Sequence, residues 1–480
     1  MSRIDDFYVP HLEWEAVAFP LTLHGPTFEG DAYVLEGPAT ITLWRDANLQ
    51  LKASLQTRLK DPRALDRGQH LGKGNIVRQL EVKARDADAR LVVLTGCVLG
   101  GSRFNSYEAN EDCYLVTLEL LFDTARIVFT EAPADRQLEW FLVEGLHQYW
   151  RGSTKRCLTA ALPKVRVGLD PEIADDFRAG QSVSKDHFLL EVPEFRCIVA
   201  EVPREFTGEL RGICLEFRDG EIEKLDAGLL DDLKGFLSLL LGAKLYYMGY
   251  SRITGGALSE AFLDSPDVPL KVPVAMQPIR YNLHHDWGNF ALQASLLFPR
   301  YRALQAKLFL NHVMERYWIA QAVPVGANLP VLAGGLEIIA SAYLKMTGNN
   351  ANEYLPQPAY DALIREEFLT LTEKLSGLPG GEVMLNKIKG AFRKGPNEKF
   401  NLFFELIGLE IGTAEKEAIK LRNKMTHSRI DYSEQDKAHD DIVSTRVYQA
   451  LFNRTLLRIL GYDGYYIDYS TKGLPLKPIT

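Results

Sequence analysis

Arg422, Asn423 and His427 place a permanent cation, an amide and a titratable imidazole within the short segment Arg-Asn-Lys-Met-Thr-His. A histidine can move protons near neutral pH, and a guanidinium can stabilise negative charge that develops on a phosphate. The 2′-hydroxyl of RNA can attack its own neighbouring phosphate, so the protein need not supply a nucleophile. These residue types are therefore compatible with metal-independent RNA cleavage, in which Asn423 orients the imidazole or binds a phosphate oxygen.

Basic residues surround this segment and could hold one or two backbone phosphates of an RNA. They are Lys416, Lys420, Lys424 and Arg429. The same charges also fit a solvated helix face with ordinary i,i+4 ion pairs. A histidine near the C-terminus of a helix is favoured by the helix dipole without any function. Both interpretations are open at this level.

The spacing of the arginine and the histidine is a weak signal by itself, because Arg280 and His285 repeat it. That second pair lies near Pro273 and Pro278 in an extended stretch, and no asparagine follows its arginine. On an ideal helix, Asn423 and His427 share a face, whereas positions 422 and 427 lie about 140° apart around the axis. The arginine and histidine would converge if the helix loosened near residue 427, or if a second copy of the chain completed the site.

The elements around the segment are predicted to be helical. After about residue 286 the apolar residues recur at helical spacing, and 413–427 forms one helix of this region. Pro299 is expected in the first turn of a long helix, and Gly461 is expected to end the last one. The tail 462–480 is expected to pack back as irregular structure. The predicted helices are 226–241, 299–321, 331–346, 361–375, 384–392, 399–411, 413–427 and 433–460.

The first 286 residues alternate mainly with period two, which is typical of antiparallel strands with one buried face. Residues 39–44 and 49–55 are predicted to pair as a hairpin around Asp46-Ala-Asn48. The fold class is therefore α+β: a β-rich region over 1–286, with a possible break near 150–165, and a helical domain over 287–480. The other predicted strands are 75–82, 89–99, 112–121, 126–130, 165–168, 188–192, 195–201, 210–217, 244–250 and 272–282.

Composition limits the class of protein. The 480 residues are 46 % hydrophobic and 25 % charged with a net charge of −8, so any nucleic-acid contact must come from a local basic patch. Five cysteines without a C-x-x-C pair predict free, buried thiols in a reducing compartment, and no metal site or cofactor is expected. The acidic N-terminus lacks an apolar signal segment, and the purely apolar runs are too short to span a bilayer. A cytoplasmic protein without membrane association is expected.

The segment Arg422-Asn-Lys-Met-Thr-His427 resembles the R-N-x-x-x-H signature of the HEPN superfamily, and the layout resembles ApeA-type bacterial anti-phage proteins. The resemblance covers most of the chain, with Gly37-Pro-Ala-Thr-Ile-Thr-Leu-Trp44 in the expected N-terminal place. It implies a metal-independent endoribonuclease that acts in abortive infection, usually as a homodimer or higher homo-oligomer. Arg422 and His427 would be catalytic, and Asn423 and Glu337 would be supporting polar residues.

The resemblance also implies partners: an RNA substrate and a phage-derived trigger that the β-rich region senses. Lys420, Lys424 and Arg429 would contact the RNA. Two alternatives come from other functional classes. In one, a non-catalytic HEPN module dimerises and binds nucleic acid or a protein partner. In the other, the β-rich region is a ligand-binding domain and the helices are an oligomerisation platform.

Overall fold

The computed structural model describes fourteen stretches of the chain. They are residues 19–28, 38–46, 48–59, 80–108, 112–143, 187–202, 211–218, 220–255, 257–266, 277–279, 287–323, 327–348, 353–427 and 435–480. The chain divides into two compact units, one β-rich and one helical. This agrees with the predicted α+β class. The predicted strand at 165–168 and most of that at 272–282 lie outside these stretches.

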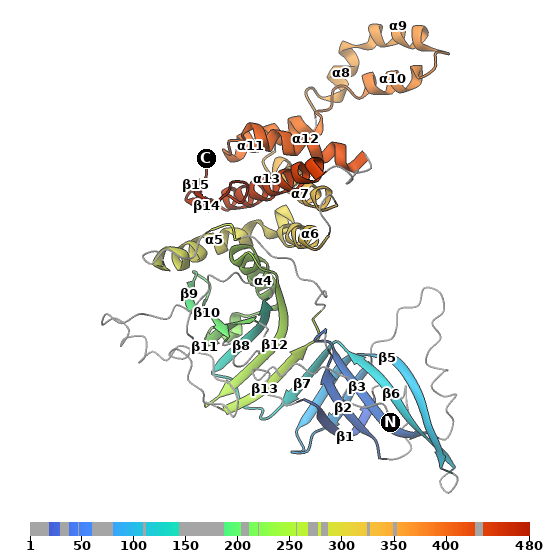
Figure 1. Ribbon diagram of the computed structural model, residues 1–480, viewed down its shortest axis with the longest axis vertical. Helices are drawn as coiled ribbons and strands as arrows, with labels where there is room; N and C mark the ends of the chain where they lie inside the picture. The colour runs from blue at the N-terminus through green and yellow to red at the C-terminus, as the bar shows by residue number, and fades with distance from the viewer. Residues whose placement is uncertain are drawn as a thin grey trace. The chain divides into compact units, whose positions relative to one another are not determined.

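The strands of the β-rich unit belong to one antiparallel sheet (Figure 1). They are β1 (Leu21–Phe28), β2 (Thr40–Arg45), β3 (Leu51–Leu59), β4 (Leu80–Arg85), β5 (Leu91–Glu108), β6 (Cys113–Phe122), β7 (Thr124–Val128), β8 (Arg136–Val143), β9 (His187–Glu191), β10 (Arg196–Val202), β11 (Arg211–Arg218), β12 (Leu245–Thr254) and β13 (Ala257–Asp264).

The first six strands close on themselves into a small barrel in the order β1, β2, β3, β6, β5, β4. Their inward residues are aliphatic and fully buried, among them Leu23, Ile41, Leu55, Val92 and Leu118. The predicted hairpin is confirmed, since β2 pairs with β3 from Thr40↔Gln56 to Arg45↔Leu51. Alternation along each strand directs every second side chain into this core, which is why the period-two pattern located the hairpin.

Strand β5 is the junction between the barrel and the rest of the sheet. Its first half pairs with β7 and its second half with β6, and the two partners are separated by Asp123. Asp123 donates its backbone N–H to the Thr95 carbonyl at 3.0 Å. Gly96 lies opposite with φ +68°, where an added Cβ would come within 2.1 Å of the Asp123 carboxylate. Only glycine fits there, so the sheet can fork at this point.

Beyond the fork, the strand order is β7, β13, β12, β8, β11, β10, β9. Strands β1, β8 and β13 were not predicted from the sequence. Strand β8 is buried on both faces from Gln137 to Val143, so it has no alternating pattern to recognise. Cys97, Cys113, Cys197 and Cys214 are free and buried, as predicted. Cys157 lies outside the described residues.

The helical unit contains one helix from the earlier part of the chain, α4 (Ala227–Leu241). This helix was predicted at 226–241 and packs with α5. Phe236 contacts Phe298 and Tyr301 at ring-centroid distances of 5.3 and 5.5 Å. Asp232 pairs with Arg302 at 3.7 Å. The helical unit therefore takes in a helix that precedes residue 286.

The remaining helices follow in chain order. They are α5 (Trp287–Leu308), α6 (Leu310–Ala322), α7 (Asn328–Met346), α8 (Gln357–Leu363), α9 (Arg365–Leu375), α10 (Gly381–Lys389), α11 (Pro396–Ile407), α12 (Thr413–His427) and α13 (Gln435–Ile459). The tail forms a small antiparallel pair, β14 (Tyr465–Ile467) and β15 (Leu476–Pro478), where irregular structure was expected.

The prediction of one long helix at 299–321 is wrong. Pro299 lies inside α5, and the chain breaks at Phe309, which has a left-handed φ of 55°. The buried side chains explain the break. A continuous helix would place Tyr301 and Leu308 on the side opposite to Leu310 and Tyr317, yet all four are buried. The left-handed residue resets the register so that both apolar faces can pack. The predicted helix 361–375 is likewise two helices, α8 and α9.

Helix α7 has the length and apolar character of a membrane span, and 44 % of its apolar window is buried within the protein. It packs against α6, α11, α12 and α13. Leu332, Leu336 and Ile339 are almost fully buried there. The core helix of a water-soluble protein has these same properties.

Candidate functional site

Helix α12, which carries the Arg422–His427 segment, has the bounds predicted for it. Its start is fixed by Glu415, which accepts a hydrogen bond from the Gly412 backbone N–H at 2.7 Å. This carboxylate thereby satisfies one of the amide groups that a helix N-terminus leaves without an intrahelical partner. An acid in the first turn also complements the positive end of the helix dipole.

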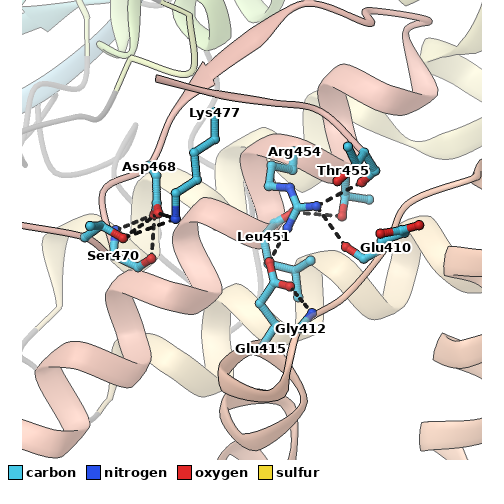
Figure 2. Close-up of polar contacts among 11 residues, drawn as sticks. Glu410, Gly412, Glu415, Leu451, Arg454, Thr455, Asp468, Ser470 and Lys477 are labelled. Carbon is cyan, nitrogen blue, oxygen red and sulfur yellow. Dashed lines mark hydrogen bonds and ion pairs between the residues drawn. The ribbon is translucent and has the colours of Figure 1, made fainter. Parts of the chain in front are cut away.

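The same carboxylate joins α12 to α13 (Figure 2). Its other oxygen pairs with Nη1 of Arg454, a side chain only 7 % exposed. Nη2 of Arg454 donates to the carbonyls of Glu410 and Thr480 at 2.8 and 3.0 Å. The guanidinium also lies over the Tyr466 ring, 5.2 Å from its centroid. Arg454 therefore binds together the start of α12, the loop before it and the C-terminal strand pair.

The helical register decides which side of α12 each position of the segment occupies. Ala418 and Ile419 are buried against the bundle. Position 422 follows them by four and three residues, so it lies on the packed side. Position 427 follows Lys416 and Lys420, both exposed, by eleven and seven residues and shares their side. Helix α12 stays helical to residue 427, so the loosening considered from the sequence does not occur before that residue.

The side chains of Arg422, Asn423, Lys424 and His427 lie outside the described part of the structure, as does all of Arg429. Lys420 is exposed on α12. Glu337 is exposed on α7, a helix that packs against α12. The structure thus gives the backbone of the predicted site and its support, and it brings the helices of Lys420 and Glu337 together.

A second polar arrangement, which the sequence analysis missed, crosses one face of the β-rich unit from β8 to β7. We call it the polar strip; its members are Gln137, Glu139, Tyr247, Tyr250, Arg252, Glu260 and Arg126. Glu139 is 1 % exposed and accepts hydrogen bonds from Gln137 Nε2 and, at 2.7 Å, from the Tyr247 hydroxyl. Burial raises the pKa of Glu139 to about 7 against the opposing effect of those hydrogen bonds and of Arg252.

The other carboxylate of the polar strip, Glu260, behaves in the opposite way. Burial alone would raise its pKa, but hydrogen bonds from Arg126 and Tyr250 lower the pKa overall. Tyr250 donates at 2.8 Å and Arg252 Nη1 at 3.1 Å. Arg252 Nε also donates to Gln137 Oε1 at 2.8 Å, which links the two carboxylates. The polar strip therefore holds one ionised carboxylate and one that titrates near neutral pH.

The only sequence signal of the polar strip is polar residues in strands that are otherwise apolar, Gln137 and Glu139 in β8 and Glu260 in β13. Within the described stretches, no three His, Cys, Asp or Glu side chains gather as a set of metal ligands. The polar strip itself offers proton binding at Glu139 and ion pairing at Glu260. No family model, curated protein or solved structure matches the chain.

Proposed function

We propose that this chain is a metal-independent endoribonuclease of HEPN type that acts in bacterial anti-phage defence. The observation that carries the proposal is the position of Arg422-Asn-Lys-Met-Thr-His427 in the last turns of α12. That helix is anchored at its first turn by Glu415 and Arg454 and packs against α7 and α13. An anchored helix can hold reacting groups in a fixed geometry, which a mobile loop would not.

In the proposed reaction, the 2′-hydroxyl of the RNA attacks the adjacent phosphorus and the 5′-oxygen of the next nucleotide leaves. His427 moves the proton, and Arg422 stabilises the charge on the phosphate in the transition state. The products are a 2′,3′-cyclic phosphate and a 5′-hydroxyl, and no metal or cofactor enters the step. Lys420, exposed on the same helix, and Lys424 and Arg429 would contribute sequence-independent phosphate binding.

The register of α12 supports a site shared between two chains. Positions 422 and 427 are about 140° apart on a regular helix, so one copy presents them in different directions. A homodimer could combine the arginine of one copy with the histidine of the other. The β-rich unit would then sense a phage-derived trigger or restrain the nuclease.

The same 140° separation also fits the alternative of a HEPN module that dimerises and binds RNA without cutting it. His427→Ala and Arg422→Ala in the full chain separate the two functions. We expect cleavage of a labelled RNA to fall at least about 100-fold in each variant, and to survive EDTA in the parent. Lys345→Ala, at an exposed position of α7, is the matched control.

Circular dichroism must show that each variant is folded before its activity is compared. Unchanged cleavage by folded His427→Ala protein would contradict the proposal. RNA binding by the parent without cleavage at any enzyme concentration would establish the alternative.

A further inference from the structure

Helices α8, α9 and α10 form a group of their own between α7 and α11 in the helical unit (Figure 1). In an ordinary helical domain, each helix buries an apolar stripe against its neighbours. Here α8 and α9 contain no buried residue, and the single one in α10 is Gly381. This group, 357–389, is called the α8–α10 hairpin below.

Large apolar side chains of the α8–α10 hairpin are exposed to an unusual degree. Some on α9 and α10 are half-buried, namely Phe368, Leu371, Leu375, Leu385 and Ile388. Others are more than half exposed: Leu363 (67 %), Leu369 (63 %), Leu378 (56 %), Val383 (59 %) and Met384 (54 %). Two helices alone cannot bury such a set, because each has only one neighbour. Several large, exposed apolar side chains gathered on one short segment are a feature of interaction sites.

The α8–α10 hairpin is nevertheless internally fixed. The Tyr360 hydroxyl donates to the Ile388 carbonyl at 2.6 Å, and the Tyr360 and Phe392 rings lie 5.5 Å apart. Gly381 touches the end of α9 so closely that a Cβ would come within 2.1 Å of the Leu375 carbonyl oxygen. The exposed side chains therefore project from a defined scaffold, which lowers the entropic cost of binding a partner.

The charges of the two helices are complementary and unpaired. Helix α9 carries Glu366, Glu367 and Glu373 against two cations and is net negative, whereas α10 carries Lys387 and Lys389 against one acid and is net positive. None of these five side chains forms an ion pair with any residue that the structure describes. A twofold axis that sets α9 of one copy on α10 of another would match both pairs of surfaces at once.

We propose that the α8–α10 hairpin is a self-association surface, on which two copies of this chain pack α9 against α10 into a four-helix layer. A nucleic acid fits this surface poorly because α9 would repel its phosphates. A second copy supplies both the opposite charges and the apolar residues. This proposal is independent of RNA cleavage, because self-association is measured as the mass of the protein in solution.

The first test measures the mass of the full chain by light scattering across a dilution series. We expect a dimer, and Leu369→Glu with Met384→Glu should raise the dimer dissociation constant by roughly 100-fold or more. Both positions are exposed, so the fold should be unaffected. Leu296→Glu, at a residue 60 % exposed on α5, is the matched control and should leave the dimer intact.

The second test uses charge reversal to show that the pairs form between chains. Reversing Glu366 and Glu367 to Lys should give a monomer, as should reversing Lys387 and Lys389 to Glu. Mixing the two reversed proteins should restore a heterodimer, because each then offers the other the opposite charge. Pairs confined within one chain would not be rescued by mixing.

A monomeric parent chain would overturn the proposal, as would a dimer that both hairpin variants leave unchanged. RNA cleavage is assayed on the same proteins. A hairpin variant that is monomeric but active would leave the self-association surface established and would show that the nuclease site is complete without it. If His427→Ala protein loses cleavage but stays a dimer, then His427 is needed for cleavage and not for self-association.

Discussion

Two parts of the helical unit differ in how far their charged side chains are paired and their apolar side chains are buried. In the bundle of α6, α7, α12 and α13, the helices share an apolar core that includes Leu336, and the buried guanidinium of Arg454 is paired with Glu415. In the α8–α10 hairpin, Glu366 and Lys387 form no ion pair with any part of the chain that the structure describes, and Leu369 is 63 % exposed. The bundle therefore buries an apolar core within one chain, whereas the hairpin leaves large apolar side chains exposed, as an unoccupied interface would. This difference supports the proposal that the α8–α10 hairpin binds a second copy of the chain.

The two regions should differ most in how much stability is lost when an arginine is replaced. Replacing Arg454 by Ala removes the partner of the Glu415 carboxylate, which is only 15 % exposed, and frees the carbonyls of Glu410 and Thr480. We expect a loss of about 3–5 kcal/mol in the free energy of unfolding. Arg365→Ala on α9, where the arginine is exposed, should change it by less than about 0.5 kcal/mol.

Urea denaturation of the two arginine variants beside the parent measures both values. Equal losses in the two variants would contradict the difference between the bundle and the hairpin. They would mean that Arg365 has a structural partner in solution and that the hairpin is part of the folded core.

The polar strip of the β-rich unit extends the comparison to a buried group whose charge is only partly compensated. The pKa of Glu139 is about 7 in the folded protein and near 4.5 when exposed. Between these values the folded state binds the extra proton, so stability falls as pH rises from 4.5 to 7 and is level above 7. Glu139→Gln removes this slope. At pH 8 the variant should be up to about 3 kcal/mol more stable than the parent, with little difference at pH 5.

The measurement is urea unfolding of parent and Glu139→Gln at a series of pH values, and the difference between the two curves isolates this carboxyl group. Glu119→Gln, at an exposed position of β6, is the matched control and should not alter the pH dependence. A difference between parent and variant that is constant with pH would show that Glu139 does not titrate in this range.

Much of the fold could be predicted because periodicity reports burial on one face. Helix α12 was located to the residue, and the β2–β3 hairpin nearly so, since each has one apolar and one polar side. Strand β8 was missed because both of its faces are buried. The break at Phe309 was missed because a change of packing partner, rather than a helix-breaking residue, causes it. The hydrophobic pattern of a helix or strand shows which of its faces is buried, but not which neighbouring element that face packs against.

The candidate sites show the same limit. The residue types of Arg422 and His427 and their helix could be read from the sequence, but not the ion pair of Glu415 with Arg454, residues 39 positions apart. Nor could the polar strip be foreseen, because Glu139 on β8 and Glu260 on β13 are brought together only through β12, which pairs with both strands in the folded sheet. Unpaired charges on α9 and α10 likewise become visible only when all other contacts are known.

The smallest expected loss of stability comes from replacing a glutamate at a helix N-terminus. This motif occurs at both α12 and α11. Glu415 and Glu398 each accept a hydrogen bond from a glycine N–H three residues earlier, Gly412 at 2.7 Å and Gly395 at 2.5 Å. Glu415 also pairs with buried Arg454, whereas the further partner of exposed Glu398 is the hydroxyl of Tyr354, which is exposed as well. An amide can replace the carboxylate as an acceptor, so only the charge is lost. Glu415→Gln should therefore cost about 1–2 kcal/mol, and Glu398→Gln should leave the melting temperature unchanged within error.

Thermal and urea unfolding measure the stability of these two glutamine variants, and RNA cleavage is assayed on the same proteins. If α12 must be held by Arg454 to position its last turns, Glu415→Gln should lower cleavage more than its loss of stability explains, and Glu398→Gln should not. Equal stability losses would mean that the cap alone, and not its connection to α13, fixes the start of α12. The anchor would then have no part in supporting the Arg422–His427 segment.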